Sequence, residues 1–160
     1  MICFDTMVLI WGVQGKAAPG QEEMVARTKR YITSLNDENE RIMIPTPALT
    51  EYLQGFDTAE RKQQLKALEK NFFIPSFNLP AAYLAAGLAR RAQESGVKPK
   101  HASRQEVKTD VQIIATAIVN NASKIITNNT DDFQKLAELA DGRIQISDIP
   151  DVHEQQDLDL

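Results

Sequence analysis

The sequence predicts an α/β protein in which helices cover a central parallel sheet. Short apolar runs typical of strands alternate with longer segments whose apolar residues recur at helical spacing, and this order favours parallel strands joined by helices. The chain has 160 residues, of which 42% are hydrophobic and 25% are charged, and no linker or internal repeat divides it. These values are typical of a single globular domain with a core of its own.

Five short apolar runs are the predicted strands. In chain order they cover residues 1–4 (MICF), 41–44 (RIMI), 72–77 (FFIPSF), 124–127 (KIIT) and 143–146 (RIQI). The third run contains Pro75, which has no N–H group and therefore interrupts the strand.

The segments between these runs are predicted helices. Pro near the start and Gly55 at the end bound one of them, Asp57 or Thr58 is the expected N-cap of the next, and Gly96 is an expected C-cap. The predicted helices cover residues 21–40, 45–55, 57–71, 79–96, 109–121 and 128–142. Residues 15–20 and the basic stretch 97–108 are predicted loops.

Composition excludes several classes of protein. No apolar run approaches the roughly 18 residues of a membrane span. The N-terminal run lacks a basic segment and Asp5 interrupts it, so we expect a mature cytoplasmic N-terminus and not a signal peptide. Cys3 is the single cysteine, which excludes an internal disulfide and a cysteine-based zinc site. The net charge of -4 means that any surface binding nucleic acid must be locally basic.

Acidic and amide side chains gather where function is expected in parallel sheets, at the carboxyl ends of the strands. They are Asp5 after the first strand, Glu51 after the second, Asp110 at the start of the apolar helix, and Asn129, Asp131 and Asp132 after the fourth strand. Several carboxylates in one place repel one another unless a divalent cation holds them. Oxygen ligands without cysteine or histidine favour Mg²⁺ or Mn²⁺.

Each of these side chains also has a purely structural interpretation. Asp5 and Asp110 are suitable helix N-caps, and so is Asp131 or Asp132, while Glu51 alone is compatible with a solvated helix residue. Only the whole set, in this order, is specific for a metal site.

Four sequence blocks in this order resemble those of the PIN-domain ribonucleases, especially the VapC-like toxins of type II toxin–antitoxin systems. The blocks lie in FDTMVLIWG, IPTPALTEYLQG and KTDVQIIATAIVNNASKIITNNTDDF, and the likeness extends from Ile2 to about Ile146. The resemblance implies a PIN-like three-layer α/β/α fold with a central parallel sheet. We expect the nuclease domain to cover residues 1–148 and an acidic C-terminal tail to cover residues 149–160.

The resemblance also implies which residues form the site. The catalytic set would be Asp5, Glu51, Asp110 and Asp132, and the ligands of Mg²⁺ or Mn²⁺ would be Asp5, Asp110, Glu51 and Asn129. Thr6 matches a site hydroxyl that contacts substrate. Residue 7 is Met where the family commonly has Ser or Asn, which removes a polar contact near the substrate.

The implied function is that of a divalent-metal-dependent endoribonuclease, the toxin of a pair, with RNA as substrate, an antitoxin protein as partner and a homodimeric state. Lys100, Arg104 and Lys108 of the basic stretch are the candidate contacts to the RNA backbone, although a solvated loop explains them equally well. The predicted helical stretches 21–35 and 57–71 are candidates for an antitoxin groove, unless their apolar faces only fill the domain's own core.

Three other functions stay open at this point. The chain is compatible with a non-catalytic PIN-like module that binds RNA or protein, and with an RNA-processing nuclease that is not a toxin. A phosphorylatable response-regulator domain also has acids at parallel strand ends, but residues 72–77 lack the aspartate that it needs.

Overall fold

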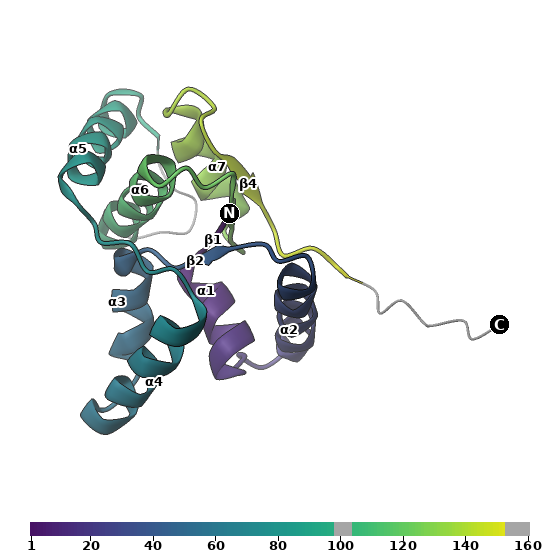
Figure 1. Ribbon diagram of the computed structural model, residues 1–160. Helices are drawn as coiled ribbons and strands as arrows, with labels where there is room; N and C mark the ends of the chain where they lie inside the picture. The colour runs from purple at the N-terminus through teal and green to yellow at the C-terminus, as the bar shows by residue number, and fades with distance from the viewer. Residues whose placement is uncertain (98–103, 153–160) are drawn as a thin grey trace.

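The computed structural model describes residues 1–97 and 104–152, which form a sheet with helices packed on it (Figure 1). Four short parallel strands make the sheet in the order β2-β1-β3-β4. They are β1 (Ile2–Phe4), β2 (Ile42–Met43), β3 (Lys124–Ile126) and β4 (Gln145–Ser147). The predicted parallel sheet is confirmed, and β1 lies at its centre.

Helices fill the connections between the strands. They are α1 (Thr6–Leu9), a π-helix η1 (Ile10–Gln14), α2 (Glu22–Asp37), α3 (Thr46–Gln54), α4 (Thr58–Asn71), α5 (Leu79–Glu94), α6 (Arg104–Val119) and α7 (Thr130–Glu138). Asp57 forms a capping box with Glu60 at the start of α4, as its sequence position predicts. Gly96 has a φ of 63° just after α5, a backbone conformation in which glycine avoids the strain of a side chain.

Successive strand residues point to opposite faces of the sheet and so build two cores. Cys3, Met43 and Ile125 face the core that α5, α6 and α7 cover. Phe4 and Ile126 face the other core, which α1, α2 and α4 cover together with most of α3. Helices on both faces make the predicted three-layer arrangement, and Cys3 is the buried strand residue that its sequence context indicates.

The third predicted strand, residues 72–77, does not form as a strand in the structure. Phe73 makes one isolated parallel bridge to Met43, and its N–H and C=O bond to the backbone of Ile42 and Ile44 at 3.0 and 2.8 Å. Pro75 follows two residues later and has no N–H to continue the pairing. Of the five predicted strands, four are therefore strands in the described residues, and the third is reduced to one isolated bridge.

The largest differences from the predicted helices lie at two places. A helical turn starts directly after Asp5, where no element was predicted, because the apolar run there is too short to show a period. The helix predicted to start at residue 109 instead starts at Arg104 as α6. Its first turns carry exposed Glu106 and Lys108, and this polar composition resembles a loop. Asp110 consequently lies in the second turn of α6 and does not begin it.

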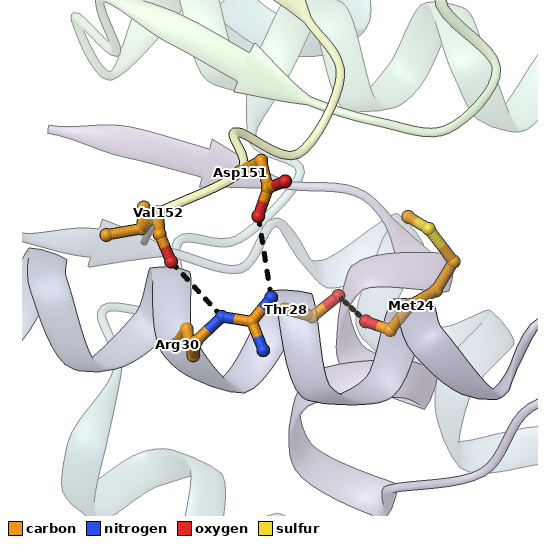
Figure 2. Close-up of polar contacts among 5 residues, drawn as sticks. All are labelled: Met24, Thr28, Arg30, Asp151 and Val152. Carbon is orange, nitrogen blue, oxygen red and sulfur yellow. Dashed lines mark hydrogen bonds and ion pairs between the residues drawn. The ribbon is translucent and has the colours of Figure 1, made fainter. Parts of the chain in front are cut away.

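The last described residues run along α2 (Figure 2). The Nε of Arg30 donates to the Val152 carbonyl at 3.1 Å, and its Nη2 lies 3.4 Å from an Asp151 carboxylate oxygen. Ile149 is fully buried in the core on the same face. The first residues of the predicted acidic tail therefore pack on the domain, while residues 153–160 lie outside the described part.

Helices α2 and α4 direct their apolar side chains into the domain's own core. Tyr31 and Leu35 of α2 and Leu68 of α4 belong to the same buried cluster. Figure 1 shows the two helices apart, with α1 between them in this view. The arrangement therefore favours the alternative in which these faces fill the core. None of the helices in residues 1–97 and 104–152 combines the length and apolar character that crossing a bilayer requires.

Candidate active site

Asp5 connects β1 directly to α1 without a loop. Its N–H donates to the Ile126 carbonyl at 3.1 Å, which continues the pairing of β1 with β3, and it is the N-cap residue of α1. The side chain is only 7% exposed. The capping interpretation of Asp5 is therefore confirmed, and its role in a metal site stays a prediction.

Both carboxylate oxygens of Asp5 accept hydrogen bonds. Oδ1 accepts from the backbone N–H of Thr6 at 2.7 Å, and Oδ2 accepts from the hydroxyl of Thr127 at 2.7 Å. Burial raises the pKa of Asp5 to about 6, and the negative charge of Glu51 adds to the rise, while the bonds from Thr127 and Thr6 act against it.

Glu51 reaches Asp5's neighbour from the middle of α3. The hydroxyl of Thr6 donates to Oε2 of Glu51 at 2.6 Å. Glu51 is half-buried, whereas Tyr52 beside it is buried against Phe56. The sequence blocks FDTMVLIWG and IPTPALTEYLQG are thus in direct side-chain contact through Thr6 and Glu51.

Asp110 lies on α6 and is 9% exposed. Its Oδ2 is buried and has no hydrogen-bond partner within the described structure. Burial raises the pKa of Asp110 to about 8, and the charges of Asp5 and Glu51, followed by Asp132 and Glu106, contribute to the rise. Its surroundings therefore favour the protonated form of Asp110 when no cation is bound.

A cleft of about 340 Å³ joins these elements. Five of the predicted site residues line it, namely Asp5, Thr6, Glu51, Asp110 and Asn129. Gln54, Glu106 and Phe133 also line it, and so does Met7, the position where the family pattern has a polar residue.

Asn129 enters the cleft from the start of α7. It is the N-cap residue of that helix, but its side chain makes no capping hydrogen bond. Its backbone N–H donates to the Thr127 hydroxyl at 3.1 Å, which fixes the turn between β3 and α7. The expected caps, Asp131 or Asp132, lie inside the helix instead.

Asp132 does not line this cleft. It is 2% exposed, and its Oδ1 lies 3.6 Å from the Nζ of Lys135 one turn along α7. Asp132, Lys135 and Asp110 together line a separate small cavity of about 10 Å³. The charge of Asp132 raises the pKa of Asp110, so the two acids interact although only one faces the cleft.

The predicted substrate contacts are only partly described. Lys108 is exposed on α6 but does not line the cleft. Arg104 begins α6, and Lys100 lies outside the described residues. Their assignment to RNA binding stays a prediction.

Carboxylate and amide oxygens are the donors that Mg²⁺ or Mn²⁺ prefers, and the unpartnered buried Oδ2 of Asp110 gains most from a cation. The donor set of the cleft therefore fits such an ion. Across the two described stretches, no three His, Cys, Asp or Glu side chains are arranged so that they would hold a metal ion together. The ligand assignment from the sequence thus stays a prediction.

Two neighbours of the acids were missed in the sequence. Glu106 is four residues before Asp110 on α6, and this spacing places both on one helical face, but only if the helix is known to start at Arg104. Thr127 ends the apolar run KIIT, where a threonine is an ordinary strand residue.

Several solved structures are similar to this chain in fold. A chain of VapBC2 from Rickettsia felis, bound to a DNA fragment from their promoter, superposes with a TM-score of 0.66 at 16% identity over 92% of this chain and 98% of that one. VapBC-1 from nontypeable Haemophilus influenzae gives 0.64 at 17% identity, with 92% and 98% covered. DNA-bound VapBC from Salmonella typhimurium gives 0.62 at 15%, with 93% and 98% covered.

At these identities the likeness concerns the fold alone. No curated protein matches the sequence significantly. The model of the PIN domain matches residues 2–139, a range that contains β1, the cleft acids and α7. The chain therefore belongs to the PIN domain family.

Proposed function

We propose that the protein is an endoribonuclease that depends on Mg²⁺ or Mn²⁺ and acts in the cytoplasm as the toxin of a toxin–antitoxin pair. The observation that carries this proposal is the cleft that Asp5, Glu51, Asp110 and Asn129 line together. Membership of the PIN domain family supports a nuclease, and the VapBC neighbours support the toxin assignment.

Asp5 and Asp110 are the proposed direct ligands of the cation. Both are buried carboxylates with raised pKa values. A cation facing them would lower these pKa values and favour the ionised forms that bind it. A bound cation would lower the pKa of a water molecule and neutralise charge on the scissile phosphate.

The other predicted residues support these two. Thr6 holds Glu51 at the rim, where its carboxylate would orient the water or the substrate. Asn129 adds a neutral oxygen or N–H donor to the cleft. Asp132 acts through Asp110, because the two line the same small cavity, the charge of Asp132 raises the pKa of Asp110, and Lys135 holds Asp132.

RNA is the proposed substrate, because a cation held by the carboxylates of the cleft would in turn bind a negatively charged phosphate. Lys108 is exposed on the helix that carries Asp110, and the contacts proposed for Lys100 and Arg104 continue this basic stretch. An antitoxin protein and a second copy of the chain are the proposed partners. The first follows from the VapBC complexes to which the fold is similar.

A cleavage assay on single-stranded RNA tests the enzyme. Wild type should cut with Mn²⁺ and stop cutting in EDTA, and Asp5→Asn should be inactive. Asp131→Asn is the matched control, because Asp131 is an exposed acid of α7 outside the cleft. If wild type binds RNA but cuts with no divalent ion, the protein is a binding module.

Expression in a bacterial host tests the toxin. Wild type should arrest growth, and co-expression of the neighbouring reading frame should relieve the arrest and give a complex in a pull-down. Cleavage without growth arrest or a bound partner would indicate an RNA-processing nuclease outside toxin–antitoxin systems.

A further inference from the structure

We infer that Thr127 is a positioning residue that orients the Asp5 carboxylate toward the cation and couples it to the turn carrying Asn129. The inference rests on the proposed metal-dependent function and assigns a role to a residue of the β3–α7 turn. It follows from the direction of two hydrogen bonds.

The hydroxyl of Thr127 has one proton to donate. Its Oγ1 accepts the backbone N–H of Asn129 at 3.1 Å and lies 2.7 Å from Oδ2 of Asp5. Since the bond with Asn129 uses a lone pair, the proton is available for Asp5. Thr127 is fully buried, so water does not compete for this proton.

This bond completes the fixation of the Asp5 side chain. The N–H of Thr6 holds Oδ1 at 2.7 Å, and Thr127 holds Oδ2. With one bond to each oxygen, the plane of the carboxylate is set. Each oxygen keeps a further lone pair for a cation. Partners that orient a metal ligand in this way typically contribute 10- to 100-fold to metal affinity.

The hydroxyl is not needed to build the sheet. The backbone N–H of Thr127 donates to the Ser147 carbonyl at 3.0 Å, and the N–H of Asp5 donates to the Ile126 carbonyl at 3.1 Å. The backbone alone therefore connects β1, β3 and β4. A valine has the same branching and an equal preference for strands, and it would avoid burying a hydroxyl. Orientation of Asp5 explains why threonine is present here.

Thr28 provides a matched control. It is a fully buried threonine whose hydroxyl donates to the Met24 carbonyl at 2.6 Å within α2 (Figure 2). Thr28→Val removes a buried hydroxyl of the same kind with no connection to the cleft.

The experiment measures Mn²⁺ affinity by calorimetry on the full chain, after circular dichroism has shown that each variant is folded. We expect Thr127→Val to bind Mn²⁺ about tenfold more weakly than wild type, because the Asp5 carboxylate can rotate. Thr127→Ser and Thr28→Val should bind as wild type does. An unchanged affinity in Thr127→Val would overturn the inference.

A second pair of variants decides the question if Thr127→Val does not fold. Thr127→Ser and Thr127→Ala differ only by the hydroxyl oxygen, so a roughly tenfold tighter Mn²⁺ affinity in the serine variant supports the role and equal affinities overturn it. Wild type without Mn²⁺ affinity would overturn the proposed metal dependence, and the inference with it. Wild-type binding with unaffected Thr127 variants would overturn the inference alone.

Discussion

Thr6 and Glu51 are joined by a hydrogen bond of 2.6 Å between the Thr6 hydroxyl and Oε2 of Glu51. The bond connects α1 to α3 across the cleft, because Thr6 begins one helix and Glu51 lies within the other. The side chain that the family pattern assigns to substrate contact therefore also holds an acid of the site.

Replacing the Thr6 hydroxyl should weaken catalysis more than folding. In Thr6→Val, Glu51 loses its donor, and we expect cleavage to fall about tenfold and the free energy of unfolding to fall by about 1 kcal/mol. Thr6→Ser should restore both quantities in RNA cleavage and urea unfolding. Thr50→Val is the control, because Thr50 is exposed on α3, the helix that carries Glu51, and its hydroxyl donates to the Thr46 carbonyl within that helix. A serine variant as poor as the valine variant would contradict the role of the hydroxyl.

Stability of the metal-free protein should fall as pH rises. The pKa values of Asp5 and Asp110 are raised in the folded state from 3.8 to about 6 and about 8, so the folded state binds more protons than the unfolded state between these values. The stabilising effect is complete below pH 3.8 and is lost as pH rises through 6 and 8. One unit corresponds to about 1.4 kcal/mol, so the loss is several kcal/mol in total. Urea unfolding in EDTA from pH 5 to pH 9 measures it.

Asp110→Asn should separate stability from function. The amide removes the charge whose burial is unfavourable, so we expect the metal-free variant to be more stable than wild type at pH 8 by about 1–3 kcal/mol. Cleavage should fall by more than about a hundredfold, because a proposed ligand is lost. Thermal unfolding with and without Mn²⁺ should show a smaller metal-induced shift than in wild type. A variant that is both less stable and fully active would contradict the assignment.

Lys108→Ala should affect RNA binding and leave the chemical step intact. Removal of one phosphate contact should lower the slope of log affinity against log salt by about 0.7 for single-stranded RNA. Cleavage at saturating RNA should stay unchanged, because Lys108 does not line the cleft. Fluorescence anisotropy over a salt series gives the slope. Lys66→Ala, which alters an exposed lysine of α4, should leave it as in wild type.

Much of the fold followed from alternating apolar runs, because β1 and β3 are buried on both faces and contain few polar residues. The run 72–77 has the same apolar character, but Pro75 interrupts it, and only one bridge at Phe73 forms. The start of α6 was missed because Glu106 and Lys108 face solvent, so the apolar period appears only later in the helix.

The part of the site that lies at or just after strand ends was predictable from the sequence. Asp5 and Glu51 do meet in one cleft, since parallel strands bring their carboxyl ends together. Asp110 reaches the same cleft from the second turn of α6, a position that the strand-end argument does not explain. The absence of Asp132 from the lining of the cleft was not predictable, because the sequence alone does not fix which face of α7 it takes. Nor was the contact between Thr127 and Asp5 predictable, since the two residues are 122 positions apart in the sequence.

The central position of β1 also has a kinetic consequence. The strand is made before its neighbour β3 and before Thr127, whose hydroxyl reaches Asp5, because both belong to the last quarter of this sequence. Contacts between such distant segments form late and slow folding. A ribosome releases Asp5, Thr6 and Glu51 long before Asp110 and Asn129, so the growing chain contains one half of the cleft without the other. A message truncated before residue 110 would therefore encode a fragment without the assembled cleft.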